Sequence, residues 1–264
     1  MFAPSGVVTL TTDFGHKGPF VGAMKGVILA RHPAARIIDI THETDVHFPA
    51  EAGFWLRRSF PYFPSGTVHI AVVDPGVGTG RDIIVVVHEG HAFVAPDNGL
   101  LAPLAQAPQA VVHRLELPRV PSIDPTQISA TFHGRDIFAP VGAEIAAGNL
   151  RPEDVGPPID QVVPSWLDEP QVTSDTIRGS VIAVDNFGNL ISNIEAELVA
   201  PRPPQRVRAG GRTIPFLRTY GDVQPGDFLA LVNSLGVVEI ARAERSAAEA
   251  LGLERGAPVI IEFE

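Results

Sequence analysis

The chain has 264 residues, of which 45% are apolar, and its 30 acidic and 20 basic residues leave a formal net charge of −10. This length fits one large domain or two ordinary ones, and the acidic balance argues against nucleic-acid binding driven by phosphate contacts. The absence of cysteine excludes disulfides, thiolate nucleophiles and cysteine-ligated metal sites. The sequence has no apolar run near the ~18 residues of a membrane span, and residues 1–13 lack the pattern of a signal peptide. We therefore expect a cytoplasmic protein.

Strands and helices alternate over the first 150 residues. Runs of β-branched and other apolar residues predict strands at residues 7–12, 37–40, 67–73, 83–87 and 111–115. Apolar residues at helical spacing predict a helix from Phe20 to Ile28, and a proline in the first turn begins a second helix at residues 49–60. This alternation predicts an α/β domain whose mostly parallel sheet is covered on both faces.

The chain changes character after residue 150. Residues 151–176 are rich in proline and acidic residues, which is typical of a linker or a wrapping segment. Short β-rich runs then follow one another between turn residues, at positions 177–184, 190–194, 206–209, 213–217, 228–232, 237–241 and 259–263. This spacing predicts a small antiparallel barrel or sandwich with one helix at 246–251. We place the first domain at residues 1–160, a linker at 161–176 and the second domain at 177–264.

The stretch VVDPGVGTGRDIIVVV, residues 72–87, is the centre of the first domain. Asp74 comes where a strand stops, a glycine-rich turn follows, and Arg81 precedes a strand that is β-branched throughout. Ligands of open α/β sheets bind at the carboxyl ends of strands, so this turn is a candidate ligand site. The turn lacks the Lys-Ser/Thr ending of a phosphate loop and the dinucleotide fingerprint. The alternative is a surface turn held by a salt bridge.

Other polar residues stand at similar places. Asp13 follows the first strand, and His133 precedes a helix predicted at residues 136–147. Asp185 and Asn189 flank the turn of DNFGNLISN, where the alternative is an Asx-rich hairpin turn. Ser234 lies in a second tight turn, NSLG. Each of these signals is weak by itself.

His88 and His91 have a spacing that suits a metal site. They flank a short link between two apolar runs, and further ligands are not evident in the sequence. We therefore interpret them as solvated residues of a hairpin tip.

Taken together, the motifs TTDFG, VVDPGVGTGR, PDNG, TFHGRD and DNFGNLISNI resemble those of the S-adenosylmethionine hydroxide adenosyltransferases, relatives of the fluorinase and chlorinase enzymes. The resemblance covers essentially the whole chain. It implies a Rossmann-like N-terminal domain, a C-terminal β-barrel and a homotrimer with active sites between subunits. It also implies hydrolysis of S-adenosylmethionine (SAM) to adenosine and L-methionine, with neither cofactor nor metal. The family is associated with the (R)-sulfonium epimer of SAM.

The resemblance also implies roles for individual residues. The catalytic set of the family falls on Asp74, Arg81 and His133. The substrate-binding positions fall on Asp13, Asp74, Asp185, Phe187, Asn189, Tyr220, Ser234 and Glu239. Gly18 and Phe20 stand where fluorinase has polar contacts to methionine. The halogenases lack an Asp at the position of Asp74, and the long insertion of fluorinase is absent here, so both differences favour water over halide.

The implied chemistry suits these residue types. Water is a poor nucleophile toward the ribose 5′ carbon and needs orientation and partial deprotonation. A carboxylate can accept its hydrogen bond, while an arginine and a histidine stabilise its hydroxide-like form. Two alternatives stay open: a halide-dependent, chlorinase-like adenosyltransferase, and an adenosine- or SAM-binding module without turnover.

Overall fold

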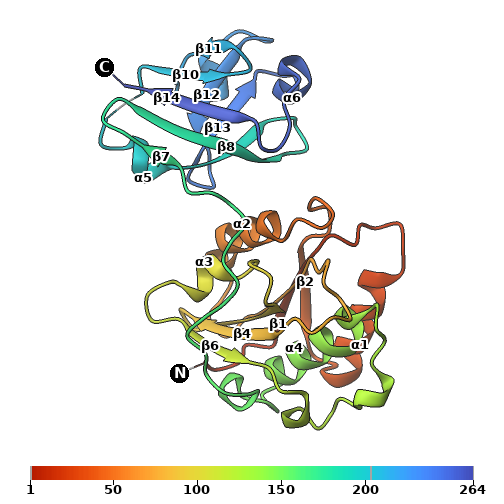
Figure 1. The fold of residues 1–264 in the computed structure, drawn as a ribbon. Helices are drawn as coiled ribbons and strands as arrows, with labels where there is room; N and C mark the ends of the chain where they lie inside the picture. The colour runs from red at the N-terminus through yellow and green to blue at the C-terminus, as the bar shows by residue number, and fades with distance from the viewer. Residues whose placement is uncertain (1, 203, 264) are drawn as a thin grey trace. The chain divides into compact units, whose positions relative to one another are not determined.

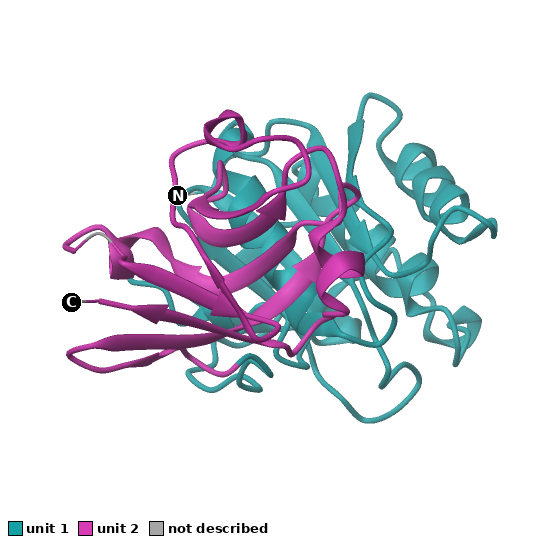
Figure 2. Ribbon diagram, turned by 90° about the horizontal axis from the view of Figure 1, so that it is seen from above, with its two compact units in different colours: residues 1–167 teal, residues 168–264 magenta. Residues whose placement is uncertain are grey.

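The chain divides into two units, Met1–Leu167 and Asp168–Glu264, each with its own sheet (Figure 2). The structure is a computed structural model that describes residues 2–202 and 204–263. It confirms the predicted class, an α/β unit followed by an antiparallel β unit. Over the described residues, the helices are too short or too polar for any of them to cross a membrane.

The sheet of the first unit has six strands in the order β2-β1-β3-β5-β4-β6. The strands are β1 (Val7–Thr12), β2 (Arg36–Thr41), β3 (Val68–Val72), β4 (Ile83–His88), β5 (His91–Pro96) and β6 (Val111–Arg114). Strands β2, β1, β3 and β5 run parallel, as predicted. Strand β4 runs antiparallel to β5 and β6, because its two-residue link to β5 is too short for a parallel crossover.

Helices cover both faces of this sheet (Figure 1). The helices are α1 (Phe20–Arg31), α2 (Pro49–Ser59), α3 (Ala102–Ala105) and α4 (Ala139–Ala146), with single 3₁₀ turns at Phe60–Tyr62, Leu117–Arg119, Pro125–Gln127 and Pro152–Asp154. Strand β3 divides its side chains between two cores. Val68, Ile70 and Val72 pack with α1 and α4, whereas Ala71, and Val73 directly after the strand, pack with α2 and α3.

The helix predicted at residues 136–147 is composite. A π-helical turn, Gly134–Phe138, comes first, and α4 continues from Ala139. The π turn places His133 directly before its first residue. π turns inside helices occur frequently at functional sites.

The second unit is an antiparallel sheet that curls toward a barrel, with the strand order β11-β10-β14-β8-β9-β13-β12 and β7 paired to β8. Its elements are β7 (Gln171–Val172), β8 (Thr176–Val184), β9 (Leu190–Glu195), α5 (Ala196–Val199), β10 (Arg206–Ala209), β11 (Arg212–Ile214), a 3₁₀ turn at Tyr220–Asp222, β12 (Phe228–Val232), β13 (Val237–Arg242), α6 (Ala247–Leu251) and β14 (Pro258–Glu262).

The strand predicted at 213–217 is shorter than expected. It ends at Ile214 because Pro215 has no amide hydrogen to donate. The Pro215 carbonyl instead accepts from the amide of Ala230, and Leu217 donates back to the Ala230 carbonyl. These bonds join the segment after β11 to β12 and bring the two ends of the sheet together.

The hairpin predicted around His88 and His91 is confirmed by strands β4 and β5. The prediction that the two histidines are solvated is wrong, and the side chain of His88 is only 10% exposed. His91 is buried, and its Nδ1 lies 3.0 Å from Nε2 of His69, whose Nδ1 lies 2.7 Å from Thr9 Oγ1. The ring of Phe60 packs edge-on against both His88 and His91. Burial lowers the pKa of His69 to about 3, so this histidine is a neutral part of the core.

Candidate active site

The carboxyl ends of the neighbouring strands β1 and β3 form the floor of a cavity of about 280 Å³ in the first unit. Asp13 follows the end of β1, and Asp74 lies two residues beyond the end of β3. His133 reaches the same cavity from the segment before the π turn. Parallel strands end at one edge of the sheet, so the fold brings together three polar residues that are far apart in sequence.

Arg81 closes the glycine-rich turn by binding Asp74. Its Nε lies 3.1 Å from each carboxylate oxygen of Asp74, and its Nη2 donates to Oδ2. The Asp74 side chain is only 4% exposed and that of Arg81 only 11%. The guanidinium also lies 5.4 Å from the ring centroid of Phe138 in the π turn. A salt bridge this well buried and bidentate fixes the orientation of both groups.

The turn itself depends on Gly78. Its φ of +75° favours glycine, and a Cβ there would lie 2.2 Å from the carbonyl oxygen of Ala130. The turn therefore packs directly on the segment that leads to His133.

Arg81 also fixes the protonation state of His133. Its Nη2 lies 2.9 Å from His133 Nδ1. A guanidinium can only donate, so Nδ1 accepts and the proton of the neutral ring is on Nε2. Burial and the adjacent Arg81 guanidinium lower the pKa of His133, against smaller opposing effects of Asp74 and Asp136. His133 is thus a neutral side chain that presents an Nε2–H donor.

Two backbone contacts brace the acidic residues. Asp13 Oδ2 accepts from the amide of His47 at 3.0 Å, and His47 also lines the cavity. Asn98 Nδ2 donates to the carbonyl of Val73 at 2.8 Å, which holds the residue before Asp74. Asn98 belongs to the PDNG motif, and the fold shows that its amide supports the segment that carries Asp74.

Three phenylalanines also line the cavity: Phe14, Phe20 and Phe132. Their rings contact one another, with centroids 5.3 to 6.0 Å apart. Sequence reasoning did not assign them as a cluster. A signal was present for two of them, because Phe14 in TTDFG and Phe132 in TFHG are each next to a polar candidate, whereas Phe20 lies outside both motifs.

In the second unit, Asp185 and Asn189 form one hydrogen-bonded turn. Asp185 Oδ1 accepts from the amides of Phe187 and Asn189, and Oδ2 accepts from Asn189 Nδ2 at 2.9 Å. This is the Asx-type turn named as the alternative. Asn189 is buried, while Phe187 is 77% exposed. A structural role for Asp185 is therefore plain, and a role in binding remains a prediction.

Glu239 is the centre of a second polar group in this unit. It is buried on β13, and its carboxylate accepts from Tyr220 Oη at 2.7 Å and from Asn233 Nδ2 at 3.1 Å. Burial raises the pKa of Glu239, against these two hydrogen bonds. Burial and the bond to Glu239 raise the pKa of Tyr220. Ser234 lies exposed in the next turn.

The structure thus joins the predicted residues into separate groups. Asp13, Asp74, Arg81 and His133 belong to one site in the first unit. The other predicted residues belong to the second unit. Asp185, Phe187 and Asn189 share one turn, Tyr220 is bonded to Glu239, and Ser234 lies in the turn between β12 and β13.

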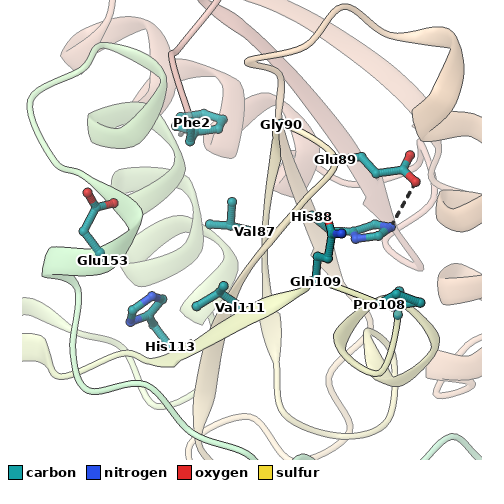
Figure 3. Close-up of a pocket in the computed structure, with 11 residues that line it drawn as sticks. Phe2, Val87, His88, Glu89, Gly90, Pro108, Gln109, Val111, His113 and Glu153 are labelled. Atoms are coloured by element: carbon teal, nitrogen blue, oxygen red, sulfur yellow. Dashed lines mark ion pairs between the residues drawn. The ribbon is translucent and has the colours of Figure 1, made fainter.

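A larger hollow of about 730 Å³ lies at the amino-terminal edge of the first sheet, beside the β4–β5 hairpin (Figure 3). His88 Nε2 lies 3.5 Å from Glu89 Oε1 there, and Phe2 and Glu153 lie on the other side of the opening. Among residues 2–202 and 204–263, groups of three or more acidic or histidine side chains placed to hold a metal ion are absent. We favour the smaller cavity because a buried acid, a guanidinium and a histidine converge there.

Comparison with known proteins identifies the class. The model of the SAM hydroxide adenosyltransferase N-terminal domain matches residues 8–156, and that of the C-terminal domain matches residues 179–260. The chain belongs to the SAM hydroxide adenosyltransferase family.

Individual relatives refine this placement. The (R)-S-adenosyl-L-methionine hydrolase of Thermus thermophilus is 38% identical over 260 residues, which cover 96% of this chain and 98% of that protein. The crystal structure of an uncharacterized conserved protein from Thermotoga maritima has a TM-score of 0.88 and 36% identity, over 97% of this chain and 99% of that one. A fluorinase from an Actinoplanes species is more distant, at 24% identity over 97% of each chain.

Proposed function

We propose that the protein hydrolyses S-adenosylmethionine, in its (R)-sulfonium form, to adenosine and L-methionine. The observation that carries this proposal is the buried, mutually bonded set of Asp74, Arg81 and His133 beside an apolar cavity. The relatives named as (R)-SAM hydrolases, 34 to 38% identical over nearly the full length, support the same substrate.

The reaction is a substitution at the ribose 5′ carbon. The water oxygen forms the new C–O bond, the C–S bond breaks, and its electron pair stays on sulfur, which leaves as the neutral thioether of methionine. The water releases one proton. A charged sulfonium is therefore converted to neutral sulfur, and the chain needs only to hold and activate the water.

Each residue of the set has a distinct part in this step. Asp74 accepts a hydrogen bond from the attacking water and draws its proton away. Arg81 holds the carboxylate in place and keeps His133 Nδ1 as an acceptor, so that the Nε2–H donor stabilises the developing hydroxide. The charged groups of Asp74 and Arg81 need not move when the water reacts, because the two side chains are already buried and paired with each other.

The remaining predicted residues would bind the rest of the substrate. Asp13 is suited to accept hydrogen bonds from the ribose hydroxyls. The His47 amide holds its Oδ2, which fixes the carboxylate and leaves Oδ1 for the ribose. Asp185, Phe187, Asn189, Tyr220, Ser234 and Glu239 would bind the adenine and the methionine amine. These roles come from the family resemblance and are proposals for this chain.

We propose a homotrimer whose active sites are completed between subunits. A cavity of about 280 Å³ lies just below the roughly 300–1,000 Å³ that is usual for small-molecule sites, so further walls are needed to enclose the whole substrate. The cytoplasmic location stays a prediction.

The alternatives are separable in one assay. Purified protein is incubated with the (R) and (S) epimers, with and without added chloride, and the products are resolved by chromatography. We expect adenosine and methionine from the (R) epimer at a rate independent of chloride. 5′-Chloroadenosine would indicate a halide adenosyltransferase, and binding without release of methionine would indicate a binding module.

A further inference from the structure

The three phenylalanines in the active-site cavity come from separate segments. Phe14 follows β1, Phe20 is the first residue of α1, and Phe132 precedes the π turn. We call them the phenylalanine cluster. The Phe20–Phe132 pair is nearly perpendicular, with centroids 5.3 Å apart. All three line the cavity that contains Asp13, Asp74 and His133.

The backbone leaves room for these rings at two glycines. A Cβ on Gly18 would lie 2.8 Å from two ring carbons of Phe20. A Cβ on Gly134 would lie 3.1 to 3.2 Å from Phe132, Phe14 and Met24. The local sequence thus favours rings packed against each other at the cavity rather than directed elsewhere.

Phe20 is not a core residue. The residue is 47% exposed, whereas Met24 and Ile28 of the same helix are fully buried. The guanidinium of Arg135 already lies over the ring of Phe132, 5.2 Å from the ring centroid. Phe20 is therefore the ring of the cluster with the most surface available to a ligand in the cavity.

We propose that Phe20 is a specificity-determining residue that contacts the sulfonium centre of the substrate through its aromatic ring; this rests on the proposed function. The electron-rich face of an aromatic ring attracts cations, most strongly when water is excluded. A sulfonium spreads its charge over sulfur and three carbons, so it loses little hydration against an apolar wall. The carboxylate of Asp13 in the same cavity adds to the preference for a cation, whereas that of Asp74 is already paired with Arg81.

The contact has a kinetic signature. The positive charge on sulfur disappears as the C–S bond breaks, so the ring stabilises the bound substrate more than the transition state. An interaction of that kind lowers KM without raising kcat. Its loss should therefore raise KM and leave kcat unchanged or slightly higher, unlike the loss of a group that activates water.

The test compares Phe20→Leu with Phe20→Tyr. Leucine keeps an apolar side chain without the aromatic face, and tyrosine keeps the face. Leu29→Ala is the matched control, because Leu29 is 44% exposed on the same helix and lies outside the cavity lining. Turnover of S-adenosylmethionine is measured beside inhibition by S-adenosylhomocysteine, whose sulfur is uncharged.

We expect Phe20→Leu to raise KM by about 3- to 10-fold, with kcat not reduced and the inhibition constant of the thioether changed less than twofold. Phe20→Tyr should keep the wild-type difference between sulfonium and thioether, because it keeps the aromatic face, and Leu29→Ala should match the wild type. An equal loss for sulfonium and thioether, or a fall in kcat with KM unchanged, would overturn the proposal. A wild type that releases no methionine would refute the proposed function instead, and calorimetric affinities for the two ligands would then decide the role of Phe20.

Discussion

Arg81 is the residue on which the geometry of the active site depends. It bonds to both oxygens of Asp74 and to His133 Nδ1, residues that are 7 and 52 positions away. Sequence reasoning found all three residues, because an acid after a strand and a histidine before a helix are local patterns. It did not give the tautomer of His133 or the phenylalanine cluster, since both depend on contacts between distant segments.

Arg81→Lys should lower turnover by roughly 10²-fold, the usual cost of removing a preorganised donor. Lysine keeps the charge but lacks the planar fork that serves Asp74 and His133 together. Single-turnover formation of adenosine checks this, with unfolding midpoints as the control for stability.

The double variant Asp74→Ala/Arg81→Ala should lose much less turnover than the product of the losses of the two single variants, because both groups act on one water.

The neutral state of His133 predicts an acid limb in the pH profile. Its pKa is lowered below 6.5 by burial and by Arg81, so the ring is neutral at pH 7 and becomes protonated only as the pH falls through that lowered value. Protonation puts a hydrogen on Nδ1 against Arg81, and kcat/KM should then fall up to tenfold per pH unit. The profile of His133→Gln should lack this limb. An identical limb in the variant would assign it to another group.

At the scale of elements, the glycine-rich turn and the segment before the π turn act as one unit. Gly78 lies against the carbonyl of Ala130, three residues before His133. The sequence predicted the tight turn and the strand after it. It also predicted the hairpin that makes β4 antiparallel to β5. It did not predict the π turn, because that turn depends on how α4 and its neighbours pack.

Gly78→Ala should therefore reduce activity by at least tenfold, since its Cβ must displace the segment that carries His133 or strain a φ of +75°. Gly80→Ala is the matched control in the same turn, because a Cβ there meets nothing within 4 Å. Turnover and thermal unfolding are measured for both variants. Equal effects of the two substitutions would contradict this account of the turn.

At the scale of the whole molecule, alternation of strands and helices followed by short β-rich runs was sufficient to predict two sheets of different kinds. The patterns identified the site residues of the second unit less well. Asp185 and Asn189 are fully explained by their turn, and only the family resemblance suggests that they also bind substrate.

The proposed assembly gives a prediction at this scale. The protein at micromolar concentration should have the mass of a trimer by light scattering, about three times the 28.1 kDa of one chain. Dilution that dissociates it should abolish turnover, because each site is completed by a neighbouring subunit. A fully active monomer would refute the shared site and leave the hydrolysis itself unaffected.

The central claim is that Asp74 and its partners direct water to the ribose 5′ carbon. The most direct test is a single turnover of the (R) epimer in water enriched in the heavy oxygen isotope, with mass analysis of both products. We predict one heavy oxygen in the 5′ hydroxyl of adenosine, unlabelled methionine, and a rate that falls roughly 10²- to 10⁴-fold in Asp74→Asn. Label in the amino-acid product, or a near-normal rate in Asp74→Asn, would contradict the account.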